Sequence, residues 1–206
     1  MIKNIILDFG HGGLDKKGKY TTRGKKHKFP NGEWAYEGVL NRQIGGMIQA
    51  YFRAHGTRYN VVTTVGADDS RDLSLGYRVR VANKFKPSET IFISIHCNAF
   101  NSKARGFEIF TSRGTTKSDA IAESIANSIE PYYKELKLRL RYNFSDGDKD
   151  KEADFYVLRK TRCPAVLLEC LFFDNREDFD NLKNPEFQKE LSWRIYQGIQ
   201  SYIEKN

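Results

Sequence analysis

Runs of consecutive apolar residues alternate along this chain with segments in which apolar residues recur every three or four positions. The runs lie at residues 3–9, 90–99 and 165–173, and continuous runs are typical of strands that helices cover on both faces. Shorter strands are predicted at residues 59–64, 106–111 and 155–158. The helical spacing predicts helices from Glu37 to Gly56 and at residues 75–85, 118–133 and 187–203.

This alternation predicts an α/β fold, because strands and helices that follow one another build a sheet covered on both sides. We expect about six strands in a twisted, mostly parallel or mixed sheet, and 206 residues suit a single domain. Two stretches fit no element. Residues 14–34 form a long connection rich in Gly and Lys, and the highly charged residues 134–152 are expected to be exposed and mobile.

Four ionisable residues interrupt the apolar pattern. His96 and Glu169 lie near the ends of two apolar runs, His11 follows the first run between glycines, and Glu37 opens the first helix. Open α/β sheets place their ligands at the carboxyl ends of the strands. Ordinary structural roles compete with this interpretation: a hydrogen-bonded core histidine, a carboxylate favoured by the helix dipole at Glu37, or a buried ion pair at Glu169.

Two neutral imidazoles and one carboxylate are a sound ligand set for a catalytic zinc ion, because they leave one tetrahedral position for water. The metal lowers the pKa of that water and polarises a carbonyl group. A second carboxylate outside the ligand set can take the proton from the water and pass it to the leaving nitrogen. The four residues are far apart in the sequence, and no compact zinc motif joins them.

Four motifs in order resemble the zinc-dependent N-acetylmuramoyl-L-alanine amidases of the Amidase_3 family. They are Gly10-His11-Gly12-Gly13, then Glu37 with Leu40 and Asn41, then Ser94-Ile95-His96-Cys97-Asn98-Ala99, and finally Glu169 with Phe172 and Asn175. The resemblance implies that His11, Glu37 and His96 bind Zn²⁺ and that Glu169 is the catalytic general base. It implies a single catalytic domain over residues 1–206 that cleaves the amide between N-acetylmuramic acid and L-alanine in peptidoglycan.

Several neighbouring residues bear on this interpretation. Glu33 is a competing carboxylate, but no helix start follows it, and His27 and His55 are predicted to be surface residues. Asn98 is expected to orient a ligand by a hydrogen bond instead of binding the metal. Phe9, Thr64 and Leu171 depart from residues usual in the family, at positions outside the implied site.

Two other functions remain open for the same residues. One is a zinc carboxypeptidase that acts on the stem peptide, and the other is a non-catalytic peptidoglycan-binding protein of the same fold. The products separate them, since an amidase exposes a new L-alanine amino terminus and a carboxypeptidase releases a terminal residue.

The net charge of +8 and the pI near 9.3 point to an anionic partner. No nucleic-acid motif is present, so peptidoglycan is the expected partner, and we hypothesise that the Lys-rich loop between His11 and Glu37 attracts carboxylates of the stem peptide. Cys97, Cys163 and Cys170 are expected to be buried and reduced.

No apolar run is long enough to span a bilayer, and the first residues read as a strand instead of a signal peptide. We therefore expect a monomer that is made in the cytoplasm and acts at the cell wall after release by another route. In this respect the chain resembles a phage or prophage endolysin.

Overall fold

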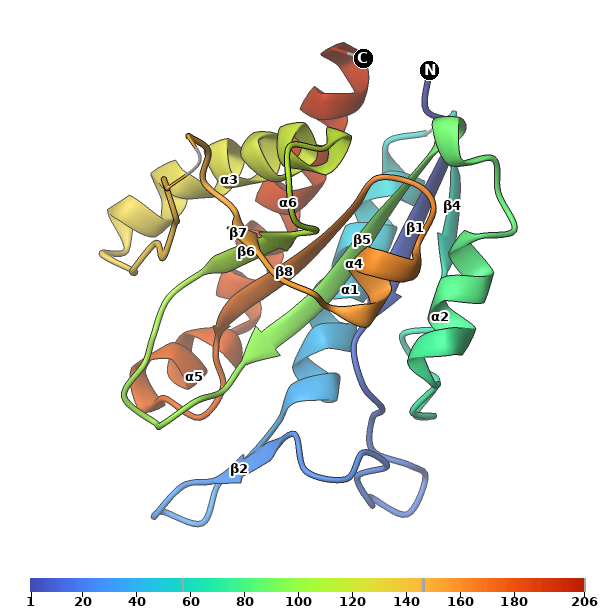
Figure 1. The fold of residues 1–206 in the computed structure, drawn as a ribbon. Helices are drawn as coiled ribbons and strands as arrows, with labels where there is room; N and C mark the ends of the chain where they lie inside the picture. Colours follow the sequence, from blue (N-terminus) through green and yellow to red (C-terminus); the bar gives the residue numbers. More distant parts are fainter. Residues whose placement is uncertain (57, 146, 206) are drawn as a thin grey trace.

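Six strands form the central sheet, in the order β4-β1-β5-β8-β6-β7 (Figure 1). The computed structural model describes residues 1–56, 58–145 and 147–205. The first four strands in this order are parallel, and β6 runs antiparallel to β8. The strand bounds are β1 Asn4–Phe9, β4 Asn60–Thr63, β5 Thr90–Asn98, β6 Glu108–Thr111, β7 Lys151–Glu152 and β8 Ala165–Phe172. The predicted fold class, a mostly parallel mixed sheet in one α/β domain, is confirmed.

Helices cover both faces of this sheet (Figure 1). The larger apolar cluster joins one face to α1 Glu37–Ala54, α3 Lys117–Glu135, α5 Arg176–Leu182 and α6 Pro185–Lys205. The smaller cluster joins the other face to α2 Leu75–Ala82 and α4 Tyr156–Lys160, and a short 3₁₀ helix, η1 Pro87–Glu89, precedes β5. No helix in the described part of the chain has the length and apolarity to cross a membrane.

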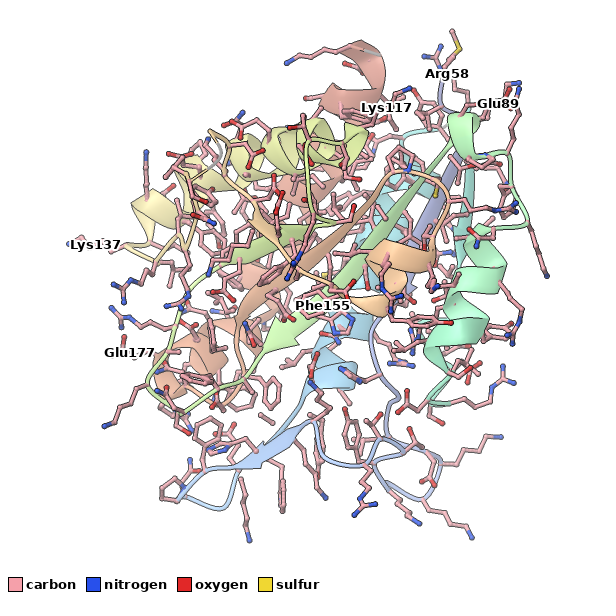
Figure 2. All side chains as sticks on the ribbon, in the orientation of Figure 1. Arg58, Glu89, Lys117, Lys137, Phe155 and Glu177 are labelled. Carbon is pink, nitrogen blue, oxygen red and sulfur yellow. The ribbon has the colours of Figure 1, made fainter. Side chains whose placement is uncertain are left out.

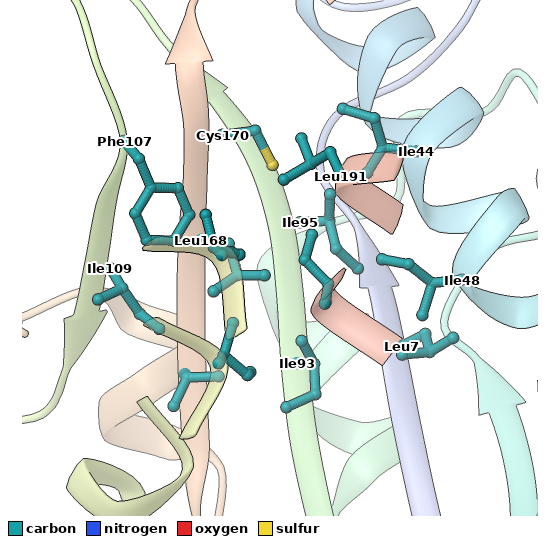
Figure 3. Packing of buried hydrophobic residues seen from close by; sticks show 14 of the residues in the cluster. Leu7, Ile44, Ile48, Ile93, Ile95, Phe107, Ile109, Leu168, Cys170 and Leu191 are labelled. Carbon is teal, nitrogen blue, oxygen red and sulfur yellow. The ribbon is translucent and has the colours of Figure 1, made fainter. Parts of the chain in front are cut away.

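The apolar runs are continuous because successive strand residues enter different cores. Ile93 and Ile95 of β5 belong to the larger cluster, whereas Phe92 belongs to the smaller one. Figure 3 shows Ile93 and Ile95 beside Leu7, Ile48 and Leu191. All of these side chains are fully buried. The three cysteines are buried as well, and none forms a disulfide. Burial on both faces makes β5 a rigid support for the residues at its carboxyl end.

The strand predicted at residues 155–158 is wrong, because this segment forms helix α4, Tyr156–Lys160. A run of four apolar residues does not distinguish a strand from one helical turn. Val157 and Leu158 are buried in the smaller cluster, while Tyr156 and Arg159 on either side are exposed. One-sided burial against α2 and β8 therefore selects the helix.

The two stretches without predicted elements are more ordered than expected. The first stretch contains most of an antiparallel hairpin, which is formed by β2 Lys26–Lys28 and β3 Trp34–Tyr36. The connection between these strands contains Asn31-Gly32, a turn signal that predicts such hairpins. In the second, β7 forms, and Leu138, Leu140 and Tyr142 are partly buried against the larger core, which corrects the expected exposure at these three residues, whereas residues 134–137 and 143–145 are exposed as predicted. Asp146 lies outside the described residues.

Candidate metal centre

Three neighbouring parallel strands bring three of the predicted site residues to one edge of the sheet. His96 lies in β5, Glu169 is its register partner in β8, and His11 follows the end of β1 by two residues. Glu37 is the first residue of α1, which packs on β1 and β5. The side chains thus come from four separate parts of the sequence.

The His11, Glu37 and His96 side chains converge on one small volume. The Nε2 atom of His11 lies 3.1 Å from Oε1 of Glu37, and the Nδ1 atom of His96 lies 2.9 Å from the same oxygen. One donor atom from each residue falls within 4.8 Å of the others. In the described part of the chain this is the one group of three or more His, Cys, Asp or Glu side chains with such spacing.

Glu37 is an ionised carboxylate with only 1% of its surface exposed. Burial acts to raise the pKa of Glu37, but hydrogen bonds from His11 and His96 outweigh burial and lower the pKa to about 2. Its position in the first turn of α1 also favours negative charge. The Asn41 amide contacts Oε1 at 3.4 Å, whereas the buried Oε2 accepts no hydrogen bond from the described residues.

Two arginines fix the turn that presents His11. His11 adopts a left-handed backbone conformation with φ 63°, which is uncommon for a residue with a side chain. Its carbonyl accepts hydrogen bonds from Arg42 at 2.8 Å and Arg78 at 3.1 Å, and Arg42 also binds the carbonyl of Gly38 in α1. The guanidinium groups therefore lock the position of the imidazole relative to Glu37.

Arg78 is itself held by a buried ion pair with Asp8. Its Nη1 lies 2.7 Å from Oδ1 of Asp8, and the two side chains are 2% and 1% exposed. Burial acts to raise the pKa of Asp8, yet the Arg78 charge and hydrogen bonds from Thr64 and Ser94 outweigh it and keep the pKa below its ordinary value. Asp8 is thus the ionised anchor of the turn.

Gly10 leaves the space that the ring of His96 occupies, because a Cβ atom there would overlap the imidazole. We expect Gly10→Ala to displace His96 and to lower metal content and activity by at least about tenfold, since a misplaced metal ligand typically costs that much. Metal analysis and circular dichroism check this. Gly76→Ala is the matched control, because a Cβ atom at Gly76 would meet neighbours only at ordinary distances, 3.5 Å and beyond. Wild-type metal content in Gly10→Ala would contradict the prediction that His96 is a metal ligand whose position depends on Gly10.

Glu169 is set apart from the group of three. Burial and the nearby charge of Glu37 raise the pKa of its carboxyl group well above the ordinary value. Its Oε2 atom is buried and accepts no hydrogen bond from the described residues. A carboxyl group with a raised pKa and a free oxygen has the properties of a general acid or base.

A cavity of about 550 Å³ exposes these residues to solvent. His11, His96 and Glu169 line it together with Lys25 and Arg78. Its apolar wall comes from the start of α2 and the residues before it, the start of α4, and β8, and consists of Leu73, Leu75, Phe155, Tyr156, Val157 and Leu167. Figure 2 marks Phe155 at the start of α4, in front of the sheet. The cavity has the size of a small-molecule or short-peptide site.

The structure brings the four predicted site residues together and keeps the other candidates away. Glu33 pairs with Arg176 and Lys183 on the α5 side of the hairpin, and neither His27 nor His55 lines the cavity. The expected hydrogen bond from Asn98 to a metal ligand is wrong, because its amide donates to Glu108 at 2.7 Å and to no residue of the group of three. Asn41, which the sequence placed only in a motif, contacts Glu37 instead.

Sequence reasoning missed the structural roles of Asp8, Arg42 and Arg78. Apart from the ion pair, the arginines bind mostly main-chain carbonyls. Every residue type has such a carbonyl, so the sequence does not show which ones an arginine binds. The single signal was Asp8, a charged residue at the end of an otherwise apolar run. A buried carboxylate of this kind requires a cationic partner.

The Lys-rich loop divides into parts with different surroundings. Lys25 lines the cavity. Lys26 and Lys28 pair with Tyr36 and Trp34 across the hairpin, and both ammonium groups lie over the Trp34 ring, at 4.9 and 5.6 Å from its centre. The hairpin is attached to α5 by the stacking of Phe29 on Phe179.

Comparison with protein-family models matches residues 5–201 to the Amidase_3 model, described as N-acetylmuramoyl-L-alanine amidase. The chain is 32% identical over 98% of its length to an uncharacterized cell wall amidase of Bacillus anthracis, and 30% identical over 97% of its length to the endolysin of Bacillus phage SPP1. It spans 36% and 65% of the length of these two relatives.

Solved structures show the same fold. An N-acetylmuramoyl-L-alanine amidase from Clostridium difficile superposes with a TM-score of 0.79 at 26% identity, and the match covers 100% of this chain and 98% of the other. The catalytic domain of CwlV, an N-acetylmuramoyl-L-alanine amidase from Bacillus (Paenibacillus) polymyxa, superposes with a TM-score of 0.74 at 25% identity over the full length of both chains.

Proposed function

Because the chain belongs to the N-acetylmuramoyl-L-alanine amidase family, we propose that it hydrolyses the amide between N-acetylmuramic acid and L-alanine in peptidoglycan. One observation carries the proposal: His11, Glu37 and His96 converge beside Glu169 in a single cavity. The family model matches nearly the whole chain, which supports one catalytic domain over residues 1–206. The relative from phage SPP1 is named an endolysin, which supports a role in cell wall degradation.

The group of three fits a zinc ion. Two imidazoles and one carboxylate match the ligand set of catalytic zinc sites, and the three donor atoms are already gathered within 4.8 Å. The buried Oε2 of Glu37 accepts no hydrogen bond from the described residues and has the Lys25 ammonium group 3.8 Å away, so a metal ion bound closer to it would stabilise its charge further. Bound there, zinc would lower the pKa of a water molecule and polarise the scissile carbonyl group.

The protein's own residues supply the proton transfers and the orientation. Glu169 accepts a proton from the attacking water while the oxygen of that water bonds to the lactyl carbonyl carbon. As the carbon–nitrogen bond breaks, Glu169 returns the proton to the leaving nitrogen of L-alanine. Arg42 and Arg78 hold the His11 turn, and the buried strand β5 holds His96, so the ligands keep their geometry through the reaction.

Digestion of purified peptidoglycan tests the proposal. We expect fragments with a new L-alanine amino terminus by mass spectrometry, and we expect a chelator to abolish their release until zinc is restored, because the site holds its metal by three protein ligands only. Release of a carboxyl-terminal amino acid would identify a carboxypeptidase. Binding to the wall without any cleavage would identify a non-catalytic protein of the same fold. A monomer in solution stays a separate prediction.

A further inference from the structure

Lys25 is held in a strained position at the edge of the proposed active site. Its φ of 53° is left-handed, and Gly24 before it has a φ of 71°. The carbonyl of Lys25 accepts a hydrogen bond of 3.1 Å from the amide of Glu37. The base of the hairpin is therefore bound directly to a candidate metal ligand. A residue with a side chain keeps such a conformation only where its surroundings enforce it, and such residues cluster at functional sites.

The Lys25 ammonium group has unused hydrogen-bonding capacity. Its Nζ atom lies 3.8 Å from Oε2 of Glu37, beyond hydrogen-bond distance, and the side chain is 53% exposed. Among the described residues that line the cavity, Arg78 is the other permanent cation, and it is 2% exposed and donates to Asp8, to Leu73 and to the His11 turn. Lys25 is thus the cation on the cavity wall that is free to contact a ligand entering the cavity.

An anion is the ligand that such a group selects. Lysine is a flexible point charge with three donors, which suits a carboxylate whose orientation is not fixed in advance. Lys25 lines the cavity with a half-exposed side chain, so its ammonium group can meet a substrate group that lies beyond the scissile bond. The carbonyl oxygen that reacts belongs at the group of three, and Glu169 handles the proton.

We propose that Lys25 is a specificity-determining residue that binds the first free carboxylate of the stem peptide after L-alanine. This inference rests on the proposed function. It assigns recognition of the stem peptide to one residue of the Lys-rich loop. Lys26 and Lys28 lie over Trp34 and do not line the cavity.

Two muramoyl dipeptides test this proposal, one with a free α-carboxylate on the second stem residue and one with a carboxamide there. We expect Lys25→Met to raise KM for the carboxylate substrate about tenfold and to leave KM for the carboxamide nearly unchanged, since a charged hydrogen bond typically contributes a factor of this size. Lys25→Arg should retain part of the preference. Lys26→Met removes the same charge one residue away and should behave as the wild type.

Binding without turnover gives a second readout. In a Glu169→Gln background, titration calorimetry with the same two dipeptides should show the tenfold loss for the carboxylate alone, with zinc content unchanged. Equal losses on both substrates, or a lower kcat with unaltered KM, would show that Lys25 acts on the reacting atoms or the metal and would overturn the proposal. No change on either would also overturn it. If the wild type cleaves neither dipeptide nor peptidoglycan, the proposed function itself fails.

Discussion

Glu169→Gln is expected to lower cleavage of the muramoyl–L-alanine bond by about 10²- to 10⁴-fold, the usual contribution of general acid–base catalysis. Glutamine has nearly the same shape as glutamate but cannot accept the proton of the attacking water. Release of new L-alanine amino termini, followed at saturating substrate, measures the loss. Zinc content should stay at the wild-type value, because Glu169 lies outside the group of three.

The same substitution should leave the metal-free protein at least as stable as the wild type. Burial raises the folded-state pKa of Glu169, so ionising this carboxyl group near neutral pH disfavours the folded state, and this cost grows as pH rises above the unfolded value. Glutamine is never ionised and avoids the cost. Thermal unfolding in the presence of a chelator measures the difference.

Glu33→Gln is the matched control for Glu169→Gln. Its carboxylate pairs with Arg176 of α5 and with Lys183, which follows α5, and it lies outside the cavity. Activity should therefore be unchanged. If Glu169→Gln cleaved muropeptide at the wild-type rate while still holding zinc, Glu169 would not be the general base.

The fold was largely predictable because burial on two faces leaves a clear pattern. The apolar run of β5 and the helical spacing of α1 and α6 each predict one element without ambiguity. Short segments were not predictable in the same way. The four apolar residues at 155–158 fit either a strand or a helical turn, and only their packing on α2 decides between the two.

The candidate site also has residues that the sequence predicts and one that it does not. His11, His96 and Glu169 could be predicted because each is a polar interruption near the end of an apolar run. Lys25 could not, because its sequence neighbours are also basic and only the backbone conformation of the hairpin base directs it to the cavity. The metal-binding role of His11, Glu37 and His96 stays a proposal.

Arg78→Met is expected to lower the free energy of unfolding by about 3 to 5 kcal/mol, the usual cost of removing one partner from a buried ion pair. The change leaves the Asp8 carboxylate buried without its counterion, removes the guanidinium donor of the Phe9 carbonyl, and leaves the His11 carbonyl with Arg42 alone. Urea unfolding of the metal-free protein measures the change. Arg71→Met is the control, because the Arg71 side chain is exposed and solvent screens its pair with Asp69, so the free energy of unfolding should change far less.

The pH dependence of this loss separates the charge effect from lost packing. In the wild type the pKa of Asp8 is lowered, so its ionisation stabilises the fold above the unfolded value of about 4, and this stabilisation is lost as pH falls. Without Arg78, burial raises the pKa of Asp8 against the hydrogen bonds from Thr64 and Ser94 only, so ionisation of Asp8 stabilises the fold less than in the wild type as pH rises. The difference between wild type and variant should therefore widen from pH 4 to pH 7. Adding Asp8→Asn to Arg78→Met should recover part of the stability at pH 7, and a loss that is equal at both pH values would show that the buried charge of Asp8 is not its cause.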